Sequence, residues 1–519
     1  MDNADPMKPA PIRPLRRSLT LAVALLMAGC ARVPFDTPKQ PSFAMGPAPA
    51  GSLNTAVEPW LSRRDGKSGI IPLTDGETAL GARLRMIEGA ESSIDVQYFL
   101  IKPDTSAVLI VEALIEAAER GVRVRVLLDD VFTTAPDDGL VRLDSIQGIE
   151  VRLYNPVARP GPSWLNFLAR FPASNRRMHN KSFTVDGIAS IVGGRNIADE
   201  YYAIEQAIEF ADFDVAVIGP AAQEVSQTFD EFWNSRLSIP VTALVGEEAA
   251  RSAIARGFTE PDSESIARAR AIYDEAVDTP FLQDLEAGRI EPLDGRIRAI
   301  SDPPAKLGYP VGSGLDVLYR EIRDEIARAK SEVLIVSPYF VPKRERVTLL
   351  SEAAARGVRV VVITNSLASN NHPYVHGGYF PYRREMLQAG IEIYEAKVDT
   401  GLTRVDGETA QLTLHTKAVI IDRQVSYIGS LNMDPRSIDI NSEMKLRIDS
   451  EEFATLFAEA VERDLPPHVY ALSINAEDEL IWTYGFGADA TATNREPDAS
   501  GWSRFVAWLA SVLPVEDQL

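Results

Sequence analysis

Two histidines are each followed by a lysine two residues later, and the pattern around them occurs twice in the chain. The first copy reads His179-x-Lys181-x4-Asp186-x6-Gly193-Gly194-x-Asn196, and the second reads His415-x-Lys417-x4-Asp422-x6-Gly429-Ser430-x-Asn432. Alternate residues of a strand lie on one face, so the histidine and lysine of each copy should point the same way. A lone His-x-Lys is more often a buried structural pair. Because the chain has only five histidines, two full copies favour a functional site.

These residue types suit transfer at a phosphodiester. A neutral imidazole can attack phosphorus while a second, protonated imidazole gives its proton to the leaving oxygen. The two lysines and two asparagines would stabilise charge on the non-bridging oxygens without a metal. We include Asp186 and Asp422 in the catalytic set, since both copies contain them. The sequence has no apparent cluster of metal ligands, so we expect no metal and no cofactor.

An attacking histidine needs a partner on its other ring nitrogen, because that partner fixes the tautomer. The candidate partners are Asp212, with Asp214 as an alternate on the same strand face, and Glu443. The sequence does not decide which of these carboxylates orients which histidine.

Other residues carry weaker predictions. Arg176 and Arg177 stand just before the first histidine and would bind phosphate, unless they form a solvated pair. His372 and His376 are favoured as structural or surface residues rather than site residues. An apolar stretch before the first motif either enters lipid or belongs to the core; its residues are Trp164, Leu165, Phe167, Leu168 and Phe171.

The two motifs belong to a longer internal repeat. Residues 121–128 are similar to residues 357–364, and the separation of 236 positions (357 − 121) equals that of the two histidines (415 − 179). Tyr98-Phe99 returns as Tyr339-Phe340 with a shift of 241 positions, which indicates small insertions. Two homologous halves are the economical explanation.

Each half alternates strands and helices. In the first half we expect a strand at 93–98, a helix at 107–120 and a strand at 122–128. The second half repeats this order at 333–337, 347–356 and 358–364. A helix that leads through a glycine turn into a β-branched strand is typical of an α/β fold with a largely parallel sheet.

The N-terminus predicts export. Arg13, Arg16 and Arg17 precede an apolar run at 19–27, and small residues lead to Cys30, the only cysteine. This order is typical of a secretory signal, and the cysteine lies where bacterial lipoproteins are lipidated. The alternative is an ordinary signal peptide with an incidental cysteine. We expect a lipoprotein of the cell envelope that is anchored to a membrane and faces the periplasm.

Composition divides the chain into segments. We predict a lipoprotein signal peptide at 1–30, a Pro-rich tether at 31–67, a first half at 68–245, a helical connector at 246–310, a second half at 311–475 and an aromatic-rich C-terminal subdomain at 476–519.

The net charge limits the partners. Lys and Arg number 53 against 74 Asp and Glu, which gives a formal charge of -21. Nucleic-acid binders draw affinity from a positive surface, so we expect no nucleic-acid partner. The same charge repels an anionic membrane, so membrane work would need a hydrophobic attachment.

The paired motifs resemble those of the phospholipase D superfamily, over nearly the whole chain after residue 67. The resemblance implies two homologous phospholipase D-like α/β/α halves with pseudo-twofold symmetry around one shared active site. It implies that His179 is the nucleophile of a phosphohistidine intermediate and that His415 is the general acid and base. It also implies a reaction without a metal cofactor.

Further stretches resemble the lipoprotein-like branch of the bacterial cardiolipin synthases; they are 175–181, 229–235, 302–306, 495–497 and 513–516. That branch implies transfer of a phosphatidyl group to phosphatidylglycerol, with membrane phospholipids, including phosphatidylethanolamine, as candidate substrates. A phospholipase D or an exported phosphodiesterase or nuclease that uses water as acceptor is the first alternative. An inactive lipid-binding envelope lipoprotein is the second.

Overall fold

The computed structural model describes residues 33–46, 51–159, 163–204, 208–258, 263–403, 409–485 and 490–519. The predicted signal peptide and Cys30 lie outside these ranges. Within them, no helix combines the length and the apolar character needed to cross a membrane.

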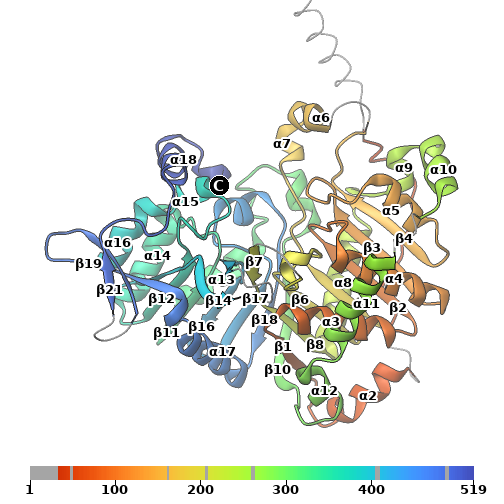
Figure 1. Cartoon of the computed structure of the whole chain (residues 1–519), viewed down its shortest axis with the longest axis horizontal. Coiled ribbons are helices and arrows are strands. Elements are labelled where there is room, and N and C mark those ends of the chain that lie inside the picture. Colours follow the sequence, from red (N-terminus) through yellow and green to blue (C-terminus); the bar gives the residue numbers. More distant parts are fainter. Residues whose placement is uncertain are drawn as a thin grey trace, which may run out of the picture.

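Two α/β halves lie side by side, as predicted from the repeat (Figure 1). The strands of the first half are β1 (Ser68–Leu73), β2 (Ser93–Tyr98), β3 (Arg123–Asp129), β4 (Ile149–Tyr154), β5 (Ser182–Val185), β6 (Ala189–Gly193), β8 (Asp214–Ile218) and β9 (Ser238–Pro240). Its helices include α2 (Ser52–Leu61), α3 (Gly76–Glu88), α4 (Thr105–Glu119), α5 (Asp137–Asp144), α6 (Ser163–Ala169), α7 (Phe171–Ser174), α8 (Pro220–Trp233) and α9 (Val241–Val245).

The second half repeats this order. Its strands are β11 (Glu332–Val336), β12 (Arg359–Asn365), β13 (Glu392–Ala396), β16 (Ala418–Ile421), β17 (Val425–Gly429), β18 (Met444–Asp449), β19 (Val469–Ile474), β20 (Leu480–Tyr484) and β21 (Thr491–Thr493). Its helices include α13 (Val317–Arg328), α14 (Lys343–Ala355), α15 (Pro373–His376), α16 (Arg383–Gln388), α17 (Glu451–Asp464) and α18 (Gly501–Val512). A small separate sheet joins β7 (Ile208–Ala211) to β14 (Asp399–Thr403) and β15 (Thr409–Leu414).

The main sheet is mixed, so the prediction of a largely parallel sheet is wrong. Strands β2, β3 and β4 are parallel to one another, but β5 runs antiparallel to β2 and forms a hairpin with β6. The second half has the same arrangement around β11, β12, β13 and the β16–β17 hairpin. The hairpin carries the histidine motif, and a hairpin necessarily adds an antiparallel pair to the sheet.

Strand pairing corrects one detail of the repeat. Ile94 pairs with Val185, and Val333 pairs with Ile421, so β2 and β11 are equivalent with a shift of 239 positions (333 − 94). The residues equivalent to Tyr98-Phe99 are therefore Ser337-Pro338. The similarity to Tyr339-Phe340 is a coincidence of composition in the loop that follows.

The segment predicted as a free tether is packed where the structure describes it. Residues 33–46 run along the first half, where Val33 joins the hydrophobic core and the Ser42 carbonyl accepts a hydrogen bond from Arg125 (2.9 Å). Helix α2 also packs on this half through the buried Trp60. Proline-rich composition predicts extended backbone correctly, but it does not predict whether that backbone is bound.

The connector and the C-terminal segment also belong to the halves. Helices α10 (Glu247–Arg256), α11 (Ser263–Val277) and α12 (Pro280–Glu286) pack on the first half, as their amphipathic patterns require. Strand β10 (Leu293–Ser301) was not predicted; it pairs with β1 and with β18 and so joins the two sheets. Strand β20 continues the second sheet beside β19, and α18 packs against α15, so the described residues of 476–519 pack on the second half.

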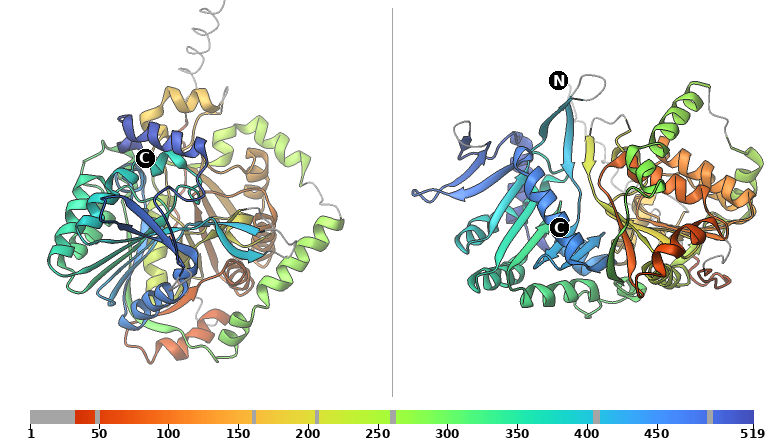
Figure 2. Two further views of the ribbon diagram at one scale, coloured as in Figure 1. Left: turned by 60° about the vertical axis from the view of Figure 1, so that its left-hand side comes forward. Right: turned by 90° about the horizontal axis from the view of Figure 1, so that it is seen from below.

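A shared core fixes the halves against each other. One hydrophobic cluster combines residues of both halves, among them Val192, Val217, Ala418 and Ile428. Burial of such side chains stabilises each by about 1.5–3 kcal/mol. The interface is therefore part of the folded core, and the histidine hairpins β5–β6 and β16–β17 contribute to it, with β17 in contact with β6 (the two halves are seen from two further sides in Figure 2).

Candidate active site

The two histidines meet at the interface because each histidine segment pairs with the opposite half. The His179 amide donates to the Ser442 carbonyl (2.9 Å), and the His415 amide donates to the Ala211 carbonyl (2.8 Å). Each histidine lies three residues before the strand of its motif hairpin, β5 or β16. Neither half contains the whole site.

The carboxylates that orient the histidines are exchanged between the halves. His179 Nδ1 lies 2.8 Å from Glu443 Oε2, and His415 Nδ1 lies 2.5 Å from Asp212 Oδ2. These contacts leave Nε2 of each ring for the reaction. The alternate partner Asp214 is not used, because it accepts a hydrogen bond from Arg83 (2.8 Å) and lies 3.6 Å from Arg195.

The motif lysines lie in the same buried cluster. Lys181 Nζ donates to the His179 carbonyl (2.9 Å), and Lys417 Nζ lies 2.9 Å from His415 Nδ1. Burial lowers the pKa of Lys181 to about 7 and that of Lys417 to about 8. Two lysines in one buried cluster favour an anionic ligand such as a phosphodiester.

The two orienting acids differ in charge. Burial alone would raise the pKa of Asp212, but Lys417 and His415 outweigh it and lower this pKa to about 2. Burial raises the pKa of Glu443 to about 7 against the opposing effect of Lys181. At neutral pH His415 thus faces a full carboxylate, whereas His179 faces a carboxyl that is partly neutral.

Both imidazoles are neutral in the free site. Burial, followed by the charge of Lys417, lowers the pKa of His415 to about 3. Burial, followed by the charges of Lys181 and Lys417, lowers the pKa of His179 well below its usual value. A bound phosphodiester anion would offset the lysine charges and raise both imidazole pKa values.

The motif asparagines flank the histidines. Asn196 Nδ2 donates to the hydroxyl of Tyr201 (2.8 Å). In the part of the chain that the structure describes, Asn196 Oδ1 and Asn432 Oδ1 are buried and have no hydrogen-bond partner. Rotation of either amide would present its NH₂ group at that place, where it could donate to phosphate.

Several residues of the site were not predicted from the sequence. Ser430 donates to Glu443 Oε2 (2.5 Å), while a Cβ at the equivalent Gly194 would lie 2.0 Å from Asp212 Oδ1. The difference between Gly194 and Ser430 therefore indicated, already in the sequence, that the two histidines have different orienting acids. Phe99 packs edge-on against His179 (ring centroids 4.6 Å apart), and Tyr201 packs against His415 (5.2 Å). The sequence marked Phe99 only as part of the repeat, and no motif marked Tyr201.

Comparisons with known proteins agree with this geometry. A family model described as "Cardiolipin synthase, PLD-like domain" matches residues 84–233 and 322–465. Cardiolipin synthase C of Escherichia coli (strain K12) is 36% identical over 477 residues, which cover 89% of this chain and 99% of that protein. The chain belongs to the phospholipase D superfamily.

Two further relatives extend over most of the chain. An uncharacterised protein of Helicobacter pylori (strain J99) is 28% identical over 502 residues, which cover 96% of this chain and 98% of that protein. The crystal structure of phosphatidylserine synthase from Haemophilus influenzae Rd KW20 superposes with a TM-score of 0.53 at 14% identity, over 81% of this chain and 91% of that one. The second likeness confirms the phospholipase D fold.

Asp186 and Asp422 are the motif residues that the structure does not bring to the phospholipase D site. Each follows the far end of its motif strand. Asp186 accepts hydrogen bonds from the amides of residues 91–93, and Asp422 accepts them from the amides of residues 330–332. Their inclusion in the catalytic set is therefore corrected: they fix the turns that begin β2 and β11.

Asp186→Asn is expected to lower the free energy of unfolding by about 2 kcal/mol, because charged acceptors hold backbone amides more strongly than neutral ones. Asparagine tolerates the positive φ of this position (51°), so the turn itself is kept. Urea unfolding measures the loss, and Asp422→Asn is the matched variant. A drop in kcat of the folded variant with unchanged stability would restore the catalytic assignment.

The other candidates also have structural roles. Arg177 is buried against Asp129 (3.2 Å), and Arg176 donates to the Lys306 carbonyl (3.1 Å), so the prediction that this pair binds phosphate is wrong. His376 contacts Arg383 and Glu496 away from the site. His372 packs against Tyr339 and Tyr374.

The lysines predict a pH dependence. Because burial lowers the pKa of Lys181 to about 7 and that of Lys417 to about 8, both lose charge as the pH rises through that range. We expect kcat/KM to fall on the alkaline side from about these values, and kcat to fall at higher pH because bound anion favours charged lysines. Lys181→Arg should move the onset of the fall in kcat/KM upward to the pKa of Lys417, since guanidinium stays charged. An unchanged profile would show that the lysine does not govern it.

Proposed function

We propose that this chain is a phosphatidyltransferase that moves a phosphatidyl group onto phosphatidylglycerol and so forms cardiolipin. The observation that carries the chemistry is the pair of histidines, each oriented by a carboxylate of the other half, with two lysines between them. The similarity to Cardiolipin synthase C over nearly all of both chains supports the lipid acceptor.

In the first step Nε2 of His179 attacks the phosphorus of the donor lipid. A phosphorus–nitrogen bond forms, the bond to the leaving alcohol oxygen breaks, and His415 gives that oxygen its proton. His415 suits this role, because the ionised Asp212 stabilises an imidazolium beside it. The partly neutral Glu443 stabilises charge on His179 less and holds it as a neutral nucleophile. Lys181 and Lys417 stabilise the phosphoryl oxygens.

In the second step the neutral His415 accepts the proton of a hydroxyl on phosphatidylglycerol. The oxygen attacks phosphorus, the phosphorus–nitrogen bond breaks, and His179 is released. If phosphatidylglycerol is also the donor, two of its molecules yield one cardiolipin and one glycerol.

Incubation with phosphatidylglycerol tests the proposal directly. Cardiolipin and free glycerol are expected in equal amounts, and addition of phosphatidylethanolamine reveals whether it serves as an alternative donor. Phosphatidic acid without cardiolipin would instead support the hydrolase. Absence of any turnover or histidine-linked phosphate would support the inactive lipid-binding protein.

Exposed aromatic side chains support attachment to a bilayer. Trp164 on α6 is 62% exposed, and Trp502 and Trp508 on α18 are 71% and 54% exposed. These helices lie on the same side of the molecule (Figures 1 and 2), and the Asn175 amide donates to Gln518 (3.0 Å) where α7 meets the C-terminal tail. Tryptophan favours the membrane interface, and a lipid on Cys30 would add the anchor.

In cells, Cys30→Ser should remove labelling by fatty acids.

A further inference from the structure

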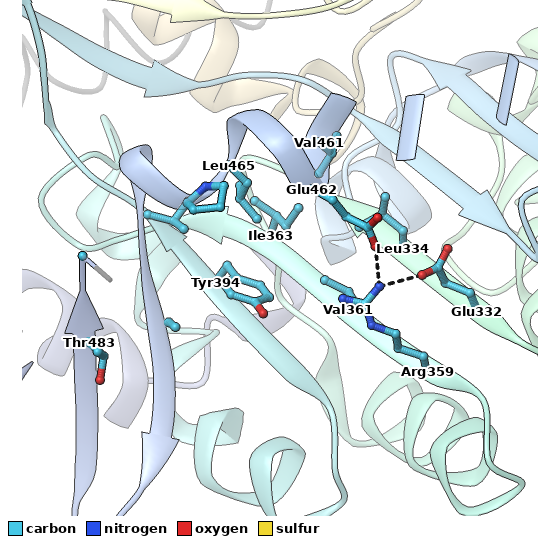
Figure 3. A pocket seen from close by; sticks show the side chains of 14 residues that line it. Glu332, Leu334, Arg359, Val361, Ile363, Tyr394, Val461, Glu462, Leu465 and Thr483 are labelled. Atoms are coloured by element: carbon cyan, nitrogen blue, oxygen red, sulfur yellow. Dashed lines mark hydrogen bonds and ion pairs between the residues drawn. The ribbon is translucent and has the colours of Figure 1, made fainter. Parts of the chain in front are cut away.

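A groove runs along the second half between α17 and the sheet. It consists of two adjoining cavities of about 400 and 470 Å³ that share Ile363, Val461, Leu465 and Val469 as walls. Figure 3 shows the first cavity, with Leu334, Val361 and Tyr394 on its sheet side and Val461 on the helix side. The side chains along most of its length are aliphatic or aromatic.

The equivalent groove of the first half is filled by the chain itself. Strand pairing makes β3 equivalent to β12 and β9 equivalent to β19. Helix α8 of the first half is therefore the equivalent of α17 in the second half. Residues 36–46 lie along α8 and the sheet there. The Ala44 amide donates to Asp230 (2.8 Å), the Ser42 amide donates to Asn234 (3.1 Å), and Arg152 donates to the Gln40 carbonyl (3.1 Å).

The two grooves differ in chemistry at equivalent positions. The first half has Asp95, Arg125 and Asp230, and Arg125 forms ion pairs with both acids (2.7 and 2.8 Å). The second half has Leu334, Val361 and Val461 in their places. The acceptor Asn234 is likewise replaced by Leu465. The fold thus keeps the groove, while Asp95, Arg125, Asp230 and Asn234 are replaced by apolar residues. Arg123, which donates to the Phe43 carbonyl in the first half (2.8 Å), has its equivalent in Arg359 at the end of the second groove.

This replacement selects the occupant. An extended peptide must satisfy its backbone N–H and C=O groups, and each one buried without a partner costs about 1–3 kcal/mol. Leu334, Val361 and Val461 offer no such partner. A hydrocarbon chain has no such requirement and gains about 0.8 kcal/mol for each buried methylene. We propose that this groove binds one acyl chain of the phospholipid substrate.

The ends of the groove agree with that occupant. At one end Asp212 and Thr416 form the wall, so this end lies on the Nδ1 side of His415, with Asp212 between the groove and the imidazole. At the other end Arg359 bridges Glu332 and Glu462 (both 2.7 Å) and closes the groove with a charged cluster (Figure 3). A lipid with its phosphate at Nε2 of the histidines would pass one chain around Asp212 to reach the groove along α17. This inference rests on the proposed function for the identity of the lipid.

Photolabelling tests the site independently of turnover. Phosphatidylglycerol with a diazirine midway along one acyl chain is bound to the full-length wild-type chain in mixed micelles, irradiated, and the labelled peptides are mapped. We expect label within residues 453–469 and 359–363. Label confined to other segments would overturn the inference. Label in the groove without any cardiolipin formation would retain the acyl site and refute the proposed function.

A groove-filling variant gives the kinetic test. Val461→Trp should lower kcat/KM for dioleoyl-phosphatidylglycerol by about tenfold or more, since the pocket loses room for the chain. The value for dihexanoyl-phosphatidylglycerol should stay within about twofold, because its short chains gain little from the groove and the substitution leaves the catalytic groups in place. Ile254→Trp, on the exposed side of α10, is the control and should change neither value. Equal losses for both lipids in a folded Val461→Trp protein would contradict the acyl site.

Discussion

His179→Ala is expected to abolish cardiolipin formation and the covalent intermediate together. The substitution removes the only group proposed to bond to phosphorus, and losses of about 10⁴-fold or more in kcat are typical for a missing nucleophile. The measurement is trapping of enzyme-bound phosphate, after a quench with alkaline detergent, from lipid labelled in its phosphorus. Phosphohistidine is labile to acid but stable to base, which distinguishes it from a serine or carboxyl phosphate.

A substrate whose leaving group needs no proton distinguishes the nucleophilic histidine from the histidine that donates the proton. His415→Ala should still form the phosphohistidine from a nitrophenyl phosphodiester lipid, because nitrophenolate needs no proton to leave. It should fail with phosphatidylglycerol. His372→Ala is the matched control, since that histidine packs between Tyr339 and Tyr374. A trap that survives His179→Ala and vanishes in His415→Ala would reverse the assignment.

Asp212→Asn is expected to be the next most damaging change. An asparagine that turns its NH₂ group to His415 Nδ1 would stabilise the wrong tautomer, and the analogous change in a serine protease costs about 10⁴-fold. Because Asp212 has a pKa of about 2, the native residue is fully charged, and both orientation and imidazolium stabilisation are lost. Steady-state kcat with phosphatidylglycerol measures the loss.

The matched variant Glu443→Gln should be less damaging. Burial raises the pKa of Glu443 to about 7, so a neutral side chain is already present in part of the population at neutral pH. Its effect should shrink as the pH falls below 7, whereas that of Asp212→Asn should persist. Equal losses in the two variants at every pH would show that the two acids are not electrostatically distinct.

The sequence predicted the parts of the site that follow from local spacing. His179 and Lys181 were expected on one strand face and lie in the segment just before β5, and the same pattern at His415 and Lys417 marked both halves. The crossed carboxylates could not be assigned, because His179 and Glu443 are brought together only by packing of the halves. Asp186 shows the opposite error, a structural residue predicted to be catalytic. A residue can recur in a motif because it holds a turn.

The sequence also did not show whether a proline-rich segment packs on the protein or stays free. Residues 33–46 have the composition of a linker, yet Arg125, Arg152 and Asp230 hold them against the first half. In the sequence these three residues look like ordinary charged residues on strands and a helix. Only their positions around one groove reveal that they bind backbone, and that the second half has none of them.

The exchange of carboxylates between the halves also bears on ancestry. A single ancestral half would have held a histidine without its acid and an acid without its histidine, so it would have worked only as a pair of identical copies. Fusion through β10 ended that constraint, because the copies no longer shared one gene sequence. From then on one acid could remain an aspartate while the other became a glutamate, and one groove could close over a peptide while the other stayed open. Symmetry was needed to create the site, and its loss allowed the two sides to specialise.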